Sequence, residues 1–265
     1  MTIFDTIGVT YDDTRQADRR IVARIASLLN LPAGSQVADI GAGTGNYSQA
    51  LAEAGFRIQA VEPSSVMQRQ AQFNADVKWL LGSAEHVPLA DASVDGVVST
   101  LAVCHFSDIQ KALAEMARIS RTSAAVIFTF DCDAGRRTWL YEYFPFLWDL
   151  FDVMPSASQL MDMLGSAMGC RAEIEVFPLP PDLTDGFAAA AWQQPWQYLD
   201  GGYRANISSF TKAEPSAVAR GVQRLSDDLA TGVWEERHGS VMHLPVFDVG
   251  YRFVFTCEGE VHISA

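Results

Sequence analysis

Basic residues are scarce in this chain. Nineteen lysines and arginines stand against 32 aspartates and glutamates, which gives a formal net charge of −13 at pH 7. Nucleic-acid binding depends on clustered Lys and Arg, and the compact basic groups here are only Arg19-Arg20 and Arg136-Arg137. The composition therefore argues against a nucleic-acid partner and favours a small molecule.

Cysteine pairs and long apolar runs are also missing. The four cysteines are widely spaced and form no C-x-x-C pair, so we expect reduced thiols and no metal site. No apolar run reaches the ~18 residues of a membrane helix, and residues 1–5 lack a basic, signal-like start. We expect a cytoplasmic protein that makes no membrane contact.

A glycine turn follows a predicted buried strand at residues 37–40. It carries glycines at alternate positions, Gly41, Gly43 and Gly45. The dinucleotide pattern G-x-G-x-x-G would need a further glycine where Asn46 stands. Asp39, two residues before the turn, would repel a pyrophosphate but attract a cofactor with an ammonium group. The segment predicts a nucleoside-containing cofactor, with a NAD-dependent oxidoreductase as the weaker alternative.

An acidic residue also ends the second predicted strand, residues 57–62. Glu62 lies 17 residues after Gly45, close to the spacing at which an acid reaches a ribose diol in nucleotide-binding folds. A carboxylate accepts hydrogen bonds from both hydroxyls. Glu62 is therefore a candidate ribose ligand, and a solvated charge at a strand end is the alternative.

These segments resemble the motifs of class I S-adenosylmethionine (SAM) methyltransferases, in particular bacterial small-molecule enzymes of the type 11-like group. Two later segments continue the resemblance in the same order. Residues 82–95 are similar to the family's G-D-A-E-x-L-P run, with Ser83 in place of the aspartate. Residues 95–106 are similar to its fourth strand and the histidine that follows. The resemblance is strong over residues 37–132.

The resemblance implies SAM as the cofactor. It implies that Asp39 holds the methionine amino group, that the backbone of 41–45 passes beneath the cofactor, and that Ala84 and Glu85 lie near the adenine. Tyr11 and Arg15 belong to a Tyr-Asp-x-x-Arg run that caps the methionine end in many relatives. The cofactor-binding residues it implies are Tyr11, Arg15, Asp39, Gly41, Ala42, Gly43, Gly45, Glu62, Pro63, Ser83, Ala84, Glu85, Ser99 and Thr100. The alternative for residues 11–15 is an exposed helix start capped by Asp13 or Thr14.

His105 is the candidate general base, because it comes just after the predicted strand at 95–100. A base helps only if the acceptor carries a proton that must leave. A packed histidine that bridges cofactor and lid is the alternative. His238 and His243 are weaker candidates, and His86 is expected to face the solvent.

The pattern of elements predicts an α/β fold: a Rossmann-like, seven-stranded, mostly parallel sheet with helices on both faces. Residues 1–182 and 248–265 would form the core, and 183–247 a helical lid inserted before the last strand. Residues 139–151 are rich in aromatics and would form either a wall of the acceptor site or a packing helix. In the family the last strand runs antiparallel at the end of the sheet.

The predicted activity is in-line transfer of the SAM methyl group to an O, N or C atom of a small-molecule acceptor, with release of S-adenosylhomocysteine. The alternative is a non-catalytic protein that binds SAM or S-adenosylhomocysteine as a sensor or assembly subunit. We expect a monomer or a homodimer.

Overall fold

The computed structural model describes residues 15–135, 138–150 and 154–260. Tyr11, Asp13 and Thr14 lie outside the described residues. The strands are β1 (Gln36–Ile40), β2 (Arg57–Glu62), β3 (Val77–Leu81), β4 (Gly96–Thr100), β5 (Ala125–Phe130), β6 (Cys170–Val176) and β7 (Tyr251–Glu260).

These strands form one sheet in the order β3-β2-β1-β4-β5-β7-β6. The strands β3, β2, β1, β4 and β5 are parallel, whereas β7 pairs antiparallel with both β5 and β6. This confirms the predicted mostly parallel, seven-stranded fold. The expected place of β7 at the end of the sheet is wrong, because β6 pairs along its outer side and forms the edge.

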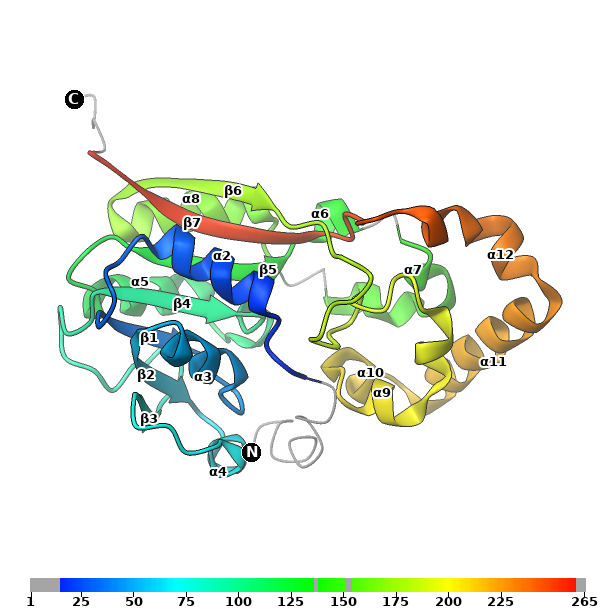
Figure 1. Ribbon diagram of the computed structural model, residues 1–265, viewed down its shortest axis with the longest axis horizontal. Helices are drawn as coiled ribbons and strands as arrows, with labels where there is room; N and C mark the ends of the chain where they lie inside the picture. Colours follow the sequence, from blue (N-terminus) through cyan, green and yellow to red (C-terminus); the bar gives the residue numbers. More distant parts are fainter. Residues whose placement is uncertain (1–14, 136–137, 151–153, 261–265) are drawn as a thin grey trace.

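Helices cover both faces of the sheet. The helices beside it are α2 (Arg19–Leu29), α3 (Asn46–Glu53), α4 (Ser65–Gln70), α5 (Ile109–Ile119), α6 (Cys132–Gly135) and α8 (Ala157–Met168), with the short 3-10 helix η2 (Val103–His105) after β4. One hydrophobic cluster joins α2 and α3 to the sheet, and a second joins α5 and α8 to its other face. Figure 1 shows these two layers.

Local sequence explains where these helices begin. The side chain of Asp108 accepts a hydrogen bond from the backbone of Lys111 and caps α5. Helix α2 starts at Arg19 with Asp18 as its cap, and the alternative caps Asp13 and Thr14 lie outside the described residues. The buried side of α2 carries the apolar residues Ile21, Val22, Ile25 and Leu29.

The remaining helices form a separate layer that we call the helical unit. It comprises α7 (Leu140–Tyr143), η3 (Pro145–Leu150), η4 (Pro195–Leu199), α9 (Gly201–Ala205), α10 (Ser208–Lys212), α11 (Pro215–Thr231), α12 (Val233–His238) and η5 (Gly239–His243). In Figure 1 it lies beyond the arrowheads of β4 and β6, at the carboxyl ends of the parallel strands.

The helical unit contains more than the predicted insertion. Tyr143 on α7 donates a hydrogen bond to Asp228 on α11 at 2.7 Å, and Phe144 packs edge to face on Phe210 of α10. Residues 138–150, which the sequence assigned to the core, therefore pack with residues from the insertion.

Three further findings concern the described residues. No helix among them is both long enough and apolar enough to cross a membrane. No group of three His, Cys, Asp or Glu in that part of the chain is arranged to hold a metal ion. All four cysteines are free; Cys132 and Cys170 are buried, and Cys104 and Cys257 are half-buried.

Candidate functional site

A cavity of about 380 Å³ lies at the carboxyl ends of the parallel strands. This volume falls within the range of small-molecule sites. The cavity is lined by Arg15, Gly41, Ala42, Gly43, Thr44, Asn46, Tyr47, Glu62, Pro63, Met67, Ser83, Ala84, Glu85, Thr100, Leu101, Ala102, Cys104, His105, Phe106, Asp185 and Lys212. We call it the first cavity.

Most of the sequence-predicted site residues line this cavity. They are Arg15, Gly41, Ala42, Gly43, Glu62, Pro63, Ser83, Ala84, Glu85, Thr100 and His105. Three others, Asp39, Gly45 and Ser99, are not among the lining residues. Residues from the first four parallel strands and their following loops thus meet where the motifs predicted they would, and their individual roles remain predictions.

The glycine turn packs closely against the protein itself. A Cβ atom on Gly41 would lie 2.5 Å from the Cβ of Ala102, so only glycine fits there. The amide groups of Gly41 and Ala42 both donate to the carbonyl of Val61, at 2.9 and 3.1 Å. Because these N–H groups already have partners within the protein, they do not form an anion site for a pyrophosphate.

Glu62 closes the turn from the end of β2. One carboxylate oxygen accepts from the amide of Gly43 at 3.0 Å, and the other accepts from the amide of Ser64 at 2.8 Å. The side chain is 5% exposed and lines the cavity. Since each carboxylate oxygen can accept more than one hydrogen bond, Glu62 can still accept from a ligand.

The three predicted residues outside the lining contact neighbouring strands and helices and stabilise the fold around the cavity. Asp39 is buried at the end of β1, where it accepts a hydrogen bond from Ser48 of α3 at 2.6 Å. Burial raises the pKa of Asp39 to about 6, and the bond from Ser48 opposes this only in part. Ser99 donates to the carbonyl of Ile40 and ties β4 to β1. At Gly45 a Cβ would strike the ring of Trp79.

Glu85 fixes the loop on the far side of the cavity. Its carboxylate accepts from the amide and the hydroxyl of Ser107, at 2.7 and 2.9 Å. Burial acts to raise the pKa of Glu85, but hydrogen bonds from its own backbone, Ser83 and Ser107 outweigh it and lower the pKa. Ser83, which replaces the family's aspartate, therefore supports a carboxylate that stays ionised at neutral pH.

A second cavity of about 120 Å³ adjoins the first. The two share Arg15, Leu101, Cys104 and His105. The second cavity is otherwise lined by Thr129, Phe130, Tyr141, Leu147, Met154, Phe187, Ala188, Ile207, Ser208, Ser209 and Tyr251. Its walls thus come from β5, β7 and both parts of the helical unit.

The boundary between the cavities is formed just after β4. Leu101 has a backbone φ of 56°, a left-handed conformation that a leucine rarely adopts. The chain turns there into η2, which carries Cys104 and His105. Burial, followed by the positive charges of Lys212 and Arg15, lowers the pKa of His105 to about 4. His105 is therefore neutral at physiological pH.

Arg15 is fixed at the same boundary by a buried carboxylate. Its guanidinium pairs with Asp185 at 2.5 Å, and the side chains are 12% and 1% exposed. Asp185 also accepts a hydrogen bond from the hydroxyl of Tyr47 on α3 at 3.0 Å. One carboxylate thus joins the N-terminal segment, the helix after the glycine turn and the start of the insertion.

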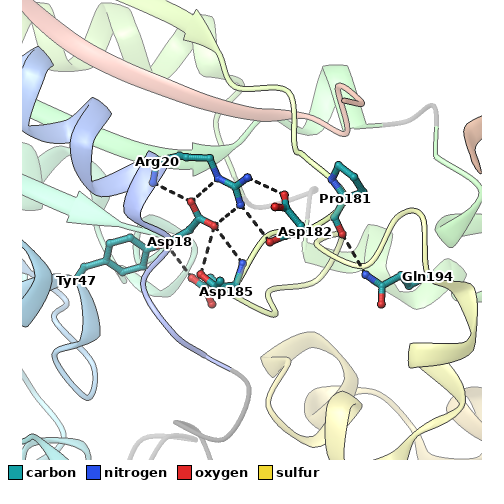
Figure 2. Close-up of polar contacts among 8 residues, drawn as sticks. Asp18, Arg20, Tyr47, Pro181, Asp182, Asp185 and Gln194 are labelled. Atoms are coloured by element: carbon teal, nitrogen blue, oxygen red, sulfur yellow. Dashed lines mark hydrogen bonds and ion pairs between the residues drawn. The ribbon is translucent and has the colours of Figure 1, made fainter. Parts of the chain in front are cut away.

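Figure 2 shows how the neighbouring segment is anchored to α2. The Asp18 carboxylate accepts from the amide of Thr184 at 3.1 Å, and Arg20 bridges Asp18 and Asp182, at 2.7 Å to each. Burial acts to raise the pKa of Asp18, but the hydrogen bonds from Arg20 and Thr184 outweigh it and lower the pKa to about 2. The first residues of the insertion are therefore held against the sheet layer.

Sequence reasoning missed several lining residues, among them Tyr47, Lys212 and Asp185. Tyr47 lies two residues after Gly45, at the start of α3, and this position could have identified it as a lining residue. Asp185 lies 170 residues from its partner Arg15 and has no motif around it. Only the fold brings that pair together.

Comparisons with known proteins agree with this geometry. A family model described as "Methyltransferase domain" matches residues 38–128. A candidate methyltransferase from an antibiotic biosynthesis pathway of Anabaena variabilis has a crystal structure that is 48% identical, with a TM-score of 0.89. That alignment covers 92% of this chain and 99% of the Anabaena chain.

Two curated relatives are methyltransferases with different acceptors. A malonyl-[acyl-carrier protein] O-methyltransferase of Serratia marcescens is 34% identical over 131 residues, which cover 48% of this chain and 50% of the relative. A demethylmenaquinone methyltransferase of Corynebacterium urealyticum is 29% identical over 221 residues, 80% of this chain and 93% of the relative. The chain spans about half the length of the malonyl-[acyl-carrier protein] relatives.

The relatives favour an enzyme over a non-catalytic binding protein, since each is named as a methyltransferase. The sheet order, the glycine turn and the nearly complete match to the Anabaena structure all point to one family. The chain belongs to the class I S-adenosylmethionine-dependent methyltransferases.

Proposed function

We propose that this enzyme methylates a small molecule that occupies the second cavity while SAM occupies the first. The observation that carries the proposal is the shared boundary of the two cavities at Arg15, Leu101, Cys104 and His105. A donor in one cavity and an acceptor in the other would meet there. The names of the relatives give two unlike acceptors. The residues that line the second cavity are therefore the better guide to the acceptor of this chain.

The first cavity has the polar groups that SAM requires. The hydroxyl oxygen of Thr100 is buried in the lining and has no hydrogen-bond partner in the described part of the chain. A buried hydroxyl without a partner is costly, and a ligand would remove that cost. Among the described residues a Cβ on Gly43 would meet only the terminal methyl group of Met67, at 3.6 Å, so the backbone there leaves room for a ligand.

We assign the cofactor's parts by residue chemistry. Glu62 would accept the ribose hydroxyls, and the loop of Ser83, Ala84 and Glu85 would contact the adenine. Thr100 and Arg15 would contact the methionine end. Asp39 lies behind the lining, so its attraction for the amino group would act through its negative charge rather than as a wall of the cavity.

When bound, SAM supplies a methyl carbon that forms a bond with the acceptor atom while the methyl–sulfur bond breaks and its electron pair stays on sulfur. The chain contributes alignment and exclusion of water. Leu101 and the aromatic residues around the second cavity provide an apolar wall at the boundary. Orientation of this kind can be worth roughly 7–11 kcal/mol of the barrier.

His105 is the proposed acceptor of the proton that leaves a hydroxyl acceptor. It lines both cavities and is neutral at pH 7, so one of its ring nitrogens is unprotonated. Its low pKa makes it a weak base in the resting enzyme. A hydroxyl oxygen that gains a methyl group becomes strongly acidic, and a weak base then suffices. A packed histidine remains the competing role.

The helical unit is the proposed lid of the acceptor site. Phe187, Ala188, Ile207, Ser208 and Ser209 line the second cavity from the insertion. A lid that closes over both cavities would exclude water from the reacting atoms. The division into a core of residues 1–182 and 248–265 and a lid of residues 183–247 then needs one change, because Tyr141 and Leu147 also contribute to the lid side.

Calorimetric titration with SAM, S-adenosylhomocysteine and NAD tests the first cavity. Micromolar binding of the first two, with no binding of NAD, is the expected result. Binding of NAD, or of none of the three, would contradict the assignment. Transfer of a labelled methyl group to small acceptors then tests the second cavity, where Ile207→Trp should block transfer and leave SAM binding unchanged.

A further inference from the structure

Four aromatic rings form the wall of the second cavity. Phe130 lies at the end of β5, Tyr251 begins β7, Tyr141 belongs to α7, and Phe187 belongs to the insertion. The ring of Tyr251 lies 4.3 Å from that of Phe187 and 5.3 Å from that of Phe130, centroid to centroid. Because the rings hold one another in place, the wall is preformed and suits a flat, apolar ligand.

The described residues around the second cavity offer no unpaired charge for an ionic acceptor. Among its described lining residues, Arg15 alone is formally charged, and Asp185 pairs with it. Glu62, Glu85 and Lys212 line only the first cavity. A carboxylate buried among the four rings would lose its hydration without gaining a counterion of its own.

The second cavity is also small. Its volume is about 120 Å³, and an apolar cavity of about 150 Å³ in another protein holds one benzene ring. The space therefore admits about one six-membered ring, with the adjoining boundary for a substituent. The aliphatic hydroxyls of Thr129, Ser208 and Ser209 also line it, beside the two tyrosines, and can hydrogen-bond a polar substituent.

We infer that the acceptor is an uncharged aromatic molecule with one ring, whose reacting atom is a hydroxyl oxygen held beside His105. This inference rests on the proposed function. The hydroxyl oxygen forms the bond to the methyl carbon, the methyl–sulfur bond breaks with its electron pair left on sulfur, and the hydroxyl proton passes to His105 and then to solvent. Volume disfavours two fused rings, and the paired state of Arg15 disfavours a carboxylate.

Three matched probes test the inference. Catechol has one neutral ring, 3,4-dihydroxybenzoate adds a carboxylate to that ring, and 2,3-dihydroxynaphthalene adds a second ring. We expect the full chain with SAM to methylate catechol with a kcat/KM at least tenfold above that of either other probe. The readout is formation of S-adenosylhomocysteine together with the mass of the methylated product.

Enlarging the cavity should change the preference in one direction only. Phe187→Ala should raise kcat/KM for the naphthalene probe relative to catechol by at least tenfold and leave the benzoate probe poor. Leu147 also lines the second cavity, so Leu147→Ala replaces the first variant if that variant does not fold. Phe247→Ala is the matched control, because Phe247 packs on Trp192 and lines neither cavity.

The outcomes separate the inference from the proposed function. Faster methylation of the benzoate or naphthalene probe by the unaltered chain overturns the inference, while methyl transfer in the second cavity still stands. Methylation of none of the three probes by a protein that binds SAM also overturns the inference. Failure to bind SAM, measured on the same sample by calorimetry, would instead overturn the proposed function.

Discussion

Arg15 and Asp185 are joined twice, by an antiparallel bridge between their backbones and by an ion pair between their side chains. The pair stands where the first and second cavities meet, and Asp185 also holds the hydroxyl of Tyr47. The segment before α2 and the start of the insertion therefore meet at the wall of the first cavity. A change at Asp185 should therefore lower both the stability of the fold and the affinity for SAM.

Asp185→Asn should lower both the melting temperature and the affinity for SAM. Removing one charge of a buried pair costs about 3–5 kcal/mol, which in a chain of this size is a fall of roughly 6 °C or more. Asp182→Asn is the control, since Asp182 is 78% exposed and an ion pair so open to solvent contributes little to stability. Equal effects of the two changes in a thermal melt would contradict the assigned role of Asp185.

Asp39 should make SAM binding depend on pH. The pKa of Asp39 is about 6, so the carboxylate loses its charge as the pH falls below that value. If it attracts the cofactor's amino group, affinity should fall steadily between pH 7 and pH 4.5. Asp39→Ala should weaken binding at least tenfold at pH 7.5, and Asp39→Asn should abolish the pH dependence. Titration calorimetry across this range measures the affinity. An affinity that does not change with pH would contradict the assigned role of Asp39.

The raised pKa of Asp39 also predicts that its charge lowers the stability of the protein without cofactor. Folding raises the pKa of Asp39 from 3.8 to about 6, so its contribution is favourable below pH 3.8 and is lost as the pH rises through 6. Asp39→Asn stays neutral and can still accept from Ser48. The variant without cofactor should melt higher than the unaltered chain at pH 8, and the difference should shrink towards pH 5.

Gly43→Ala should weaken SAM binding by at least tenfold. The new methyl group would project beside Met67 in the lining of the first cavity, where the backbone φ is 61°. Gly169→Ala is a matched control, because Gly169 has a φ of 65°, nothing within 4 Å of its Cβ position, and a place at the end of α8. Both variants should lose about 1 kcal/mol of stability from the left-handed backbone. Only the first should lose affinity.

His105→Gln should reduce kcat and leave the KM for SAM nearly unchanged. General bases contribute roughly 10²–10⁴-fold, and a packing role would instead change both constants. Since the pKa of His105 is about 4, the unaltered enzyme should keep its kcat at saturating SAM down to about pH 5. His86→Gln is the control, because His86 is exposed and contacts Lys111. An equal loss of kcat in both variants would argue against the base role.

Local patterns predicted the sheet and most of the first cavity. Both β1 and β2 are short, and an acid stands at or next to the carboxyl end of each, Asp39 before Ile40 and Glu62 as the last residue. The glycine turn follows the first of them directly. Parallel strands end at one edge of the sheet, so motifs that follow successive strands must meet there. Ten of the fourteen predicted cofactor residues line that one cavity for this reason.

Long-range contacts were beyond the reach of the sequence. The burial of Asp39 behind the lining depends on Ser48 facing it from α3, and nothing in the motif specifies which side the carboxylate takes. The aromatic segment around Tyr141 could pack on the sheet or on the insertion, because apolar periodicity does not identify a partner. The pair of Arg15 and Asp185 needed the complete fold.

A crystal structure with bound S-adenosylhomocysteine would show whether the first cavity holds the donor and the second the acceptor. We predict that the ribose lies at Glu62 and that the sulfur atom points past Leu101 and His105 into the second cavity. A sulfur atom that faces away from the second cavity, or a homocysteine chain that fills it, would contradict the division into donor and acceptor cavities.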